Sequence, residues 1–220
     1  ASLRAEGFGC LSDCQTYEAF DICYDYDIYH AFRGYLDGTA PLERYAQAVN
    51  RQEVIYPDNY CKLRFLENHD QPRAAFLVPD GPSLLNWTAF SFFQKGTGFI
   101  YAGQEAGCAH LPNLFYKDPV DWTGPDRSEQ FRRLCALKKH PLMADSAYEV
   151  HALPGDVLCA VHRKGSHRLT GVFSVRGAKA LVRVDIPDGW YENLFDGGRV
   201  EVKDRRLSCH GAPIIIETAQ

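Results

Sequence analysis

The chain has 220 residues, of which 45% are hydrophobic and 24% charged, an ordinary composition for one large or two small globular domains. The formal net charge of -4 leaves no basic stripe that could neutralise phosphates, so the composition argues against a nucleic-acid partner. No apolar run approaches the ~20 residues that cross a bilayer, so no membrane partner is expected.

The eight cysteines do not form a zinc or redox motif, because no Cys-x-x-Cys pair and no Cys/His cluster of zinc-like spacing occurs. Several lie in apolar runs, as Cys159 does in 157–161, where a reduced thiol behaves as a small hydrophobe. We therefore expect reduced cysteines and a cytoplasmic protein. Secretion stays open, because a signal peptide would lie upstream of Ala1.

The first two-thirds of the chain alternates strand-like runs with helix-like periods, which is the pattern of an α/β domain. In chain order the strand-like runs cover residues 20–24, 61–66 and 98–103, and the helix-like segments cover 29–35, 41–49, 84–95 and 128–139. The helix at 84–95 is apolar on most of its surface, so we expect it to be buried on more than one side. The helix at 128–139 is expected to bury Phe131, Leu134 and Cys135.

From about Ser146 the pattern changes to short β-rich runs separated by turn residues. These runs cover 157–161, 169–175, 181–186, 199–202 and 213–217. No helical period intervenes, which predicts an antiparallel, sandwich-like all-β module of residues 146–220. The module is large enough to fold independently.

One segment carries most of the functional information. The apolar run that ends at Leu66 leads directly into Glu67, Asn68, His69 and Asp70, with Arg73 close behind. Reactive side chains stand where strands leave the C-terminal rim of a parallel barrel. The pattern Phe65, Asn68, His69, Asp70 resembles the fourth signature region of the α-amylase family of glycoside hydrolases (family 13), where a strand ends in Phe-x-x-Asn-His-Asp.

The resemblance extends through most of the chain. Residues 24–27 resemble the sixth barrel strand and its exit, and 98–105 resemble the eighth, although the usual proline of that signature is replaced by Phe99-Ile100. The resemblance implies an α/β fold in which residues 1–145 form the C-terminal part of a (β/α)8 TIM barrel, strands six to eight. Residues 146–220 would be the C-terminal all-β antiparallel domain.

The resemblance also implies that two catalytic groups are missing. Retaining hydrolysis in this family needs a nucleophilic Asp and an acid/base Glu about 5 Å apart. Neither signature occurs upstream of Tyr24, and Glu6 fits a solvated helical charge. The chain is therefore expected to begin just after the acid/base residue and to be inactive alone. With the strand edges of a partial barrel exposed, we expect it to associate with the missing N-terminal part of the barrel or with itself, or to aggregate.

The resemblance assigns roles to five residues. Asp70 would be the catalytic carboxylate that holds the sugar's 2- and 3-hydroxyls, and His69 would hydrogen-bond a central sugar. Asn68 would brace the strand end behind them. Arg73 is predicted to bind a substrate hydroxyl or to pair with a site carboxylate, with a surface salt bridge as the alternative. Glu105 is divided evenly between substrate binding and structure. Asp25 and Asp27 could also lie at the rim, or the repeated Tyr-Asp could simply mark the exit of a strand.

The function implied is hydrolysis of α-glucosidic bonds in starch-like glucans or oligosaccharides. Transglycosylation, α-1,6-glucosidase activity and a non-catalytic carbohydrate-binding homologue remain open, as do linkage and chain-length preference. No acidic residues have the spacing of a calcium loop, so no metal or cofactor is expected in this chain, although calcium can occur elsewhere in longer family members.

Overall fold

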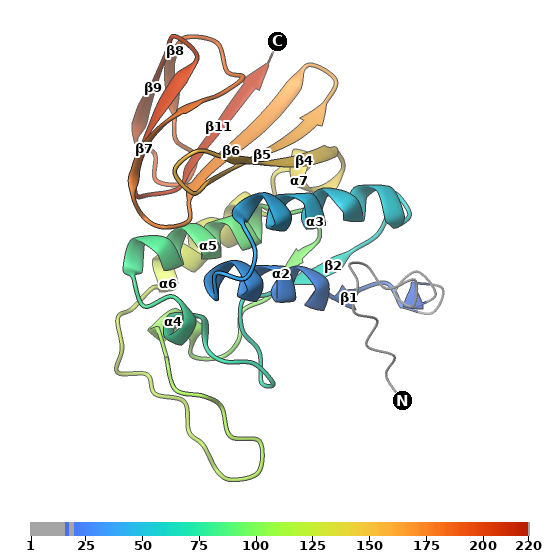
Figure 1. Cartoon of the computed structure of the whole chain (residues 1–220), viewed down its shortest axis with the longest axis vertical. Coiled ribbons are helices and arrows are strands. Elements are labelled where there is room, and N and C mark those ends of the chain that lie inside the picture. Colours follow the sequence, from blue (N-terminus) through green and yellow to red (C-terminus); the bar gives the residue numbers. More distant parts are fainter. Residues whose placement is uncertain (1–15, 18–19, 220) are drawn as a thin grey trace.

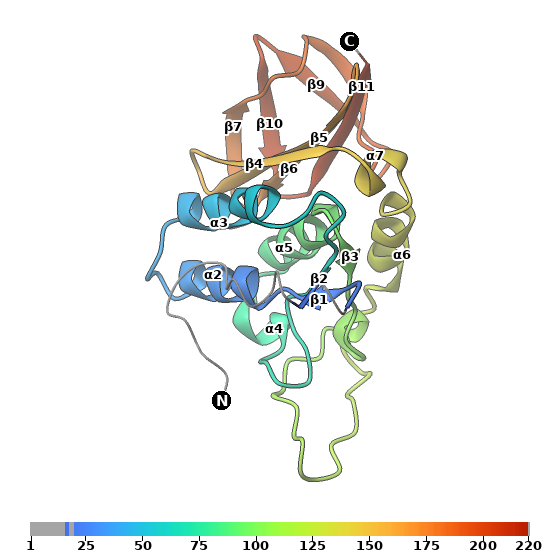
Figure 2. The same cartoon turned by 90° about the vertical axis from the view of Figure 1, so that its right-hand side faces the viewer.

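A computed structural model describes residues 16, 17 and 20–219, so Glu6, Cys10 and Cys14 lie outside the described residues. A β-sandwich occupies one end of the molecule, and helices α3 (Leu42–Ile55) and α5 (Gly81–Phe93) lie directly beneath it (Figures 1 and 2). The parallel strands and α2 (Tyr26–Leu36) come next, and a long loop at 107–127 projects at the opposite end (Figure 2).

Three short strands form a parallel sheet in the order β1-β2-β3: β1 (Cys23–Tyr24), β2 (Lys62–Arg64) and β3 (Thr97–Gly98). Cys23 lies opposite Lys62, and Leu63 lies opposite Thr97. These strands are shorter than the predicted runs. Beyond Arg64 the chain leaves the ladder, and Phe65 stacks on the ring of Tyr29 at 5.1 Å.

The helices predicted from periodicity are present. Asp80 caps α5 by accepting a hydrogen bond from the Ser83 amide at 2.8 Å, as its Asp-Gly-Pro-Ser start predicts. The remaining helices are α4 (Ala74–Leu77), the 3-10 turn η1 (Gln104–Ala106), α6 (Ser128–Leu137) and α7 (Pro141–Ala144). Phe131 and Leu134 of α6 are buried as expected, but Cys135 is exposed, because it stands on the solvent side of that helix.

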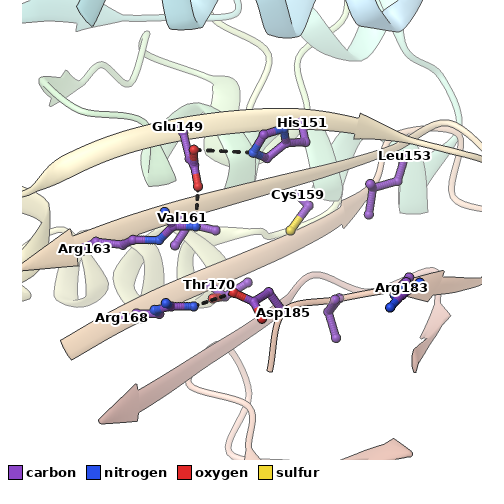
Figure 3. A pocket seen from close by; sticks show the side chains of 11 residues that line it. Glu149, His151, Leu153, Cys159, Val161, Arg163, Arg168, Thr170, Arg183 and Asp185 are labelled. Carbon is purple, nitrogen blue, oxygen red and sulfur yellow. Dashed lines mark hydrogen bonds and ion pairs between the residues drawn. The ribbon is translucent and has the colours of Figure 1, made fainter. Parts of the chain in front are cut away.

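The predicted antiparallel sandwich is confirmed as two four-stranded sheets, ordered β11-β6-β5-β4 and β7-β10-β9-β8. The strands are β4 (Ala147–Leu153), β5 (Val157–Lys164), β6 (His167–Ser174), β7 (Lys179–Arg183), β8 (Gly189–Glu192), β9 (Arg199–Lys203), β10 (Arg206–His210) and β11 (Ile214–Ala219). Apolar side chains such as Val172, Val182 and Leu207 fill the space between the sheets. Near β4 the space opens into a polar groove (Figure 3).

Helix α5 is the common wall of the two parts. Trp87, Phe90 and Phe93 are fully buried, and the rings of Phe90 and Phe93 each lie 5.4 Å from Phe173 on β6. One hydrophobic cluster therefore runs from the parallel sheet's helices into the sandwich. This burial on several sides agrees with the all-round apolar sequence of α5.

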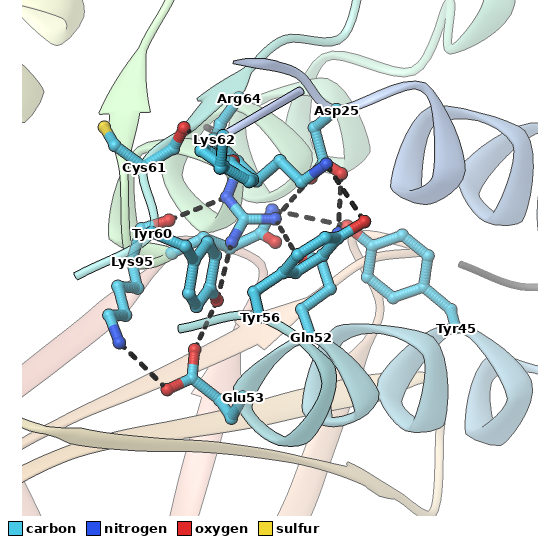
Figure 4. A network of polar contacts seen from close by, with 12 residues as sticks. Asp25, Tyr45, Gln52, Glu53, Tyr56, Tyr60, Cys61, Lys62, Arg64 and Lys95 are labelled. Atoms are coloured by element: carbon cyan, nitrogen blue, oxygen red, sulfur yellow. Dashed lines mark hydrogen bonds and ion pairs between the residues drawn. The ribbon is translucent and has the colours of Figure 1, made fainter. Parts of the chain in front are cut away.

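A buried polar network joins the parallel strands to the helices (Figure 4). The Arg64 guanidinium pairs with Asp25 and donates to Gln52 on α3 at 2.6 Å and to the Lys95 carbonyl at 2.7 Å. Gln52 in turn donates to Asp25 at 2.7 Å. Asp25 is only 2% exposed, which contradicts its placement at an open rim.

Asn50 on α3 closes the free edge of the sandwich. Its side chain donates to the Val150 carbonyl at 2.7 Å and accepts from the Val150 amide at 2.8 Å. Because β4 is an edge strand, these two bonds satisfy backbone groups that would otherwise invite pairing with another chain.

The six cysteines within the described residues are free, and most are buried. None of the helices described here is long and apolar enough to cross a membrane.

Asp25→Ala should lower the free energy of unfolding by about 3–5 kcal/mol, because it leaves the Arg64 charge buried without its carboxylate. Asp37→Ala is the matched control, since Asp37 pairs with Arg33 at the surface and is 55% exposed. It should cost less than about 1 kcal/mol. Urea denaturation followed by tryptophan fluorescence measures both, and equal small losses would contradict a structural role for the pair.

His162 provides a pH-dependent test of the contact between the sandwich and α5. Its Nε2 lies 2.8 Å from the Phe93 carbonyl and its Nδ1 lies 2.8 Å from the Ser146 hydroxyl, so a neutral ring satisfies both partners. Burial lowers the pKa of His162 from 6.5 to about 4. Between pH 4 and 6.5 the His162 ring is protonated in the unfolded chain and neutral in the folded one. The contribution of His162 to the free energy of unfolding is therefore complete above pH 6.5 and is lost as the pH falls towards 4.

We expect the acid loss attributable to His162 to be about 2–4 kcal/mol over this window. His162→Gln should flatten the pH profile of stability there, whereas His167→Gln, at an exposed position on β6, should leave it unchanged. Urea midpoints measured from pH 4 to 7 test this expectation, and equal flattening by the two variants would count against it.

Candidate functional site

The segment after β2 divides into a buried layer and an exposed layer. Glu67, Asn68 and Arg73 are each 2% exposed or less, whereas the side chains of His69 and Asp70 are 51% and 46% exposed. Nε2 of His69 lies 3.2 Å from Oδ2 of Asp70. A soluble ligand can therefore reach His69 and Asp70 together.

Asn68 fixes the turn that presents this pair. Its Oδ1 accepts the Asp70 amide at 2.9 Å, and its Nδ2 donates to the Tyr26 hydroxyl at 3.1 Å. Tyr26 is the first residue of α2, directly after β1. The Asp70 loop is thus held to the exit of the neighbouring strand, and these contacts are those of a brace behind the site.

Arg73 and Glu67 form a buried ion pair under the site, with 2.8 Å between Nη1 and Oε1. The second oxygen of Glu67 accepts the Ala74 amide at 2.7 Å and so satisfies the start of α4. Burial raises the pKa of the Glu67 carboxyl, against the lowering effects of Arg73 and of the Ala74 amide. The sequence pattern assigns no role to Glu67, although Glu67 belongs to the same polar run.

Arg73 also reaches the loop that follows β3. It donates to the Ala102 carbonyl at 2.8 Å, and its guanidinium lies 4.2 Å from the centre of the Tyr101 ring. Gly103 lies in the same loop at φ +94°, and a Cβ there would lie 2.5 Å from Val120, so the packing of this loop requires glycine. Arg73 therefore ties two loops together beneath the surface. Its burial contradicts the alternative of a surface salt bridge, whereas its role in substrate binding stays a prediction.

Glu105 is half-buried in η1 and turns back on its own loop. Its carboxylate accepts the Gly103 amide at 3.0 Å, and its backbone carbonyl accepts the Arg127 amide at 2.7 Å. These bonds are structural, and they leave the other carboxylate oxygen, Oε1, for a further partner. The evenly divided prediction for Glu105 stays a prediction.

No group of three or more His, Cys, Asp or Glu side chains within the described part of the chain could hold a metal ion. His69 and Asp70 offer polar contact through one exposed imidazole and one exposed carboxylate. Such a pair can grip vicinal hydroxyl groups through charge-assisted hydrogen bonds.

Residues 149–216 match the family model described as the bacterial alpha-amylase C-terminal domain. Two curated proteins are similar over most of the chain: alpha-amylase 2 of Dictyoglomus thermophilum, 20% identical over 195 residues, and alpha-amylase 2 of Schwanniomyces occidentalis, 23% identical over 184. These matches cover 81% and 79% of this chain, but only 34% and 35% of the relatives, so the chain spans about a third of their length.

Two solved structures are similar over nearly the whole chain. An alpha-amylase from Lactobacillus plantarum is 34% identical with a TM-score of 0.90, and the match covers 99% of this chain and 52% of the other. A noncanonic maltogenic alpha-amylase from Thermotoga neapolitana is 28% identical with a TM-score of 0.80, covering 94% and 53%.

The two layers of the site predict different effects on stability. Glu67→Ala should cost about 3–5 kcal/mol, because Arg73 would stay buried without its carboxylate. Asp70→Ala should change stability by no more than about 0.5 kcal/mol, because the side chain is half exposed. Chemical denaturation compares the two, with Glu67→Gln expected between them since it keeps an acceptor for the Ala74 amide. A loss on Asp70→Ala as large as that on Glu67→Ala would show that Asp70 is structural.

Proposed function

This chain belongs to the α-amylase family of glycoside hydrolases and matches the C-terminal part of its relatives, and from that premise we propose that it supplies the sugar-holding side of an active site that hydrolyses α-glucosidic bonds. The observation that carries the proposal is the exposed Asp70–His69 pair, held in place from below by Asn68. The proposed substrate is a starch-like glucan or an oligosaccharide derived from it.

We assign the parallel strands β1, β2 and β3 to strands six, seven and eight of a (β/α)8 barrel. The support is their parallel pairing in chain order with helices between them. Within the described residues β1 and β3 have no strand on their outer sides. A shallow depression beside β1, lined by Phe20, Ile22, Tyr24 and Asp27 among others, is where a further strand would pack.

The same assignment divides the chain into a partial barrel at residues 1–145 and an all-β domain at 146–220. Ile22, Tyr24 and Ile100 lie close to β1 or β3 and are 39–48% exposed. An N-terminal part of the barrel is the partner that would cover them, because a closed barrel has no free strand edge.

The proposed division of labour follows from retaining chemistry. A nucleophilic carboxylate and an acid/base carboxylate elsewhere in the barrel would break and re-form the glycosidic bond. Asp70 and His69 would hold the hydroxyls of the sugar in the central position. Contacts that tighten as the ring flattens towards the oxocarbenium-like transition state lower the barrier more than they strengthen ground-state binding.

The test uses a protein that joins this chain to the missing part of the barrel. In that protein Asp70→Asn should lower kcat/KM on maltooligosaccharides by about 10²-fold to 10⁴-fold, because it weakens one or two charge-assisted hydrogen bonds to the transition state. His69→Ala should act in the same direction with a smaller effect. Asp145→Asn is the control, because Asp145 is 79% exposed and pairs only with Lys164 at the surface. Reducing-end assays measure all three.

The 220-residue chain alone should release no reducing ends from soluble starch, because the covalent route needs both missing carboxylates. Hydrolysis by the isolated chain that is lost on Asp70→Ala would overturn this division of labour. The coding sequence before Ala1 gives a second test: if it lacks either carboxylate, the protein is a binding homologue and not an enzyme.

A further inference from the structure

A second polar site lies in the sandwich, away from the Asp70 loop. The inner faces of β4, β5 and β6 and the segment that follows β7 enclose a groove, which we call the arginine groove (Figure 3). Its charged residues are Glu149, Arg163, Arg168, Arg183 and Asp185, and its floor includes Cys159, Val161 and Thr170. A neighbouring depression shares Leu153, Arg183, Val184 and Asp185 and adds Arg205, so the groove continues towards the β9–β10 turn.

The groove exists because β4 turns polar residues towards the space between the sheets. His151 is 56% exposed and Glu149 36% exposed, although both lie on the strand face that points inwards. On β5 the same face carries apolar residues until Arg163. The second sheet therefore does not close over this corner of the sandwich.

The carboxylates of the groove do not neutralise all of its guanidinium charges. Glu149 pairs with Arg163 and lies 3.5 Å from Nε2 of His151. Asp185 pairs with Arg168 at 2.6 Å and with Arg205 at 3.5 Å, so three guanidiniums share two carboxylates. Among the described residues Arg183 has no side-chain hydrogen bond or ion pair, and its cross-strand neighbour is Arg206. Nε of Arg163 is buried and has no partner in the described part of the chain.

This excess is opposite in sign to the whole chain, which carries a formal net charge of -4. A concave site with low-dielectric walls concentrates such a local field. Asp185 pairs with both Arg168 and Arg205, and a guanidinium that is already oriented loses less freedom when it binds a ligand. The groove is thus built to accept a further anion.

We propose that the arginine groove binds a phosphoryl group, with Arg183 and Arg205 as its main ligands. A phosphate monoester presents several oxygens to planar guanidinium forks, which bind it by paired charge-assisted hydrogen bonds. A neutral sugar fits less well, because no Phe, Tyr or Trp ring is among the described residues that line the groove. The source of the group is a phosphorylated sugar or free inorganic phosphate. This inference does not depend on the function proposed for the Asp70 site.

Isothermal titration calorimetry in a phosphate-free buffer of low ionic strength tests the proposal on the protein that carries this chain, with inorganic phosphate, glucose 6-phosphate and glucose as probes. Both phosphates should bind, glucose should not, and added salt should weaken binding. Tighter binding of glucose 6-phosphate than of phosphate would identify the sugar ester as the ligand, and equal binding would identify the free anion.

Arg183→Gln and Arg205→Gln should each raise the Kd for phosphate by about tenfold or more, the value of one charge-assisted interaction. Arg132→Gln on α6 is the matched control and should leave the Kd unchanged, because Arg132 is 70% exposed and its ion pair among the described residues is with Glu129. The two groove residues are surface arginines, so circular dichroism of the variants should match that of the parent. The proposal is overturned if neither anion binds, or if Arg132→Gln weakens binding as much as Arg183→Gln.

Discussion

The pairing of Arg64 with Asp25 is the constraint on which the arrangement of the parallel strands depends. A guanidinium that is 1% exposed must keep all its partners, since a buried charge without them costs several kcal/mol. Its partners come from the exit of β1, from Gln52 on α3 and from the carbonyl of Lys95 after α5. The arrangement that these contacts hold places the ends of β1 and β2 side by side, where Tyr26 can reach Asn68.

The cost of burying an unpaired charge also distinguishes structural residues from ligand-binding ones among the seven residues after Leu66. Glu67 and Arg73 are buried and matched, so their charges fix the loop and cannot also respond to a ligand without a large penalty. His69 and Asp70 are exposed, so water already solvates them and their mutual attraction is weak. A ligand hydroxyl can therefore replace water at Asp70 at little cost. The rigidity of the buried pair is what allows the exposed pair to be preorganised.

The sequence predicted well what depends on local pattern and poorly what depends on pairing over distance. Helices α2, α3 and α5 follow from apolar spacing and, in α5, from the Asp80 cap. The predicted runs do not include β4, β8 and β10, in which polar residues interrupt the apolar ones. Charged residues are usually solvated, so the sequence placed Asp25 and Arg73 at the exposed rim. The partner of Asp25 is Arg64, 39 residues away in the chain, and the partner of Arg73 is Glu67, at the other end of the same loop. The sequence alone does not show that either pair is in contact.

The sandwich contributes to two hydrophobic cores. One lies between its two sheets, and the other is shared with α5. Leu158, Leu169, Phe173 and Ile215 are fully buried, and they belong to the same hydrophobic cluster as Trp87 and Phe90 of α5. If the all-β module stood alone, these side chains would meet water, at a cost of about 1.5–3 kcal/mol for each large one. Independent folding of the module, which its size allows, would therefore need a replacement for α5. Because α5 also packs on β3, a change in the sandwich core can alter the strand that leads to the loop under Asp70 without touching the site.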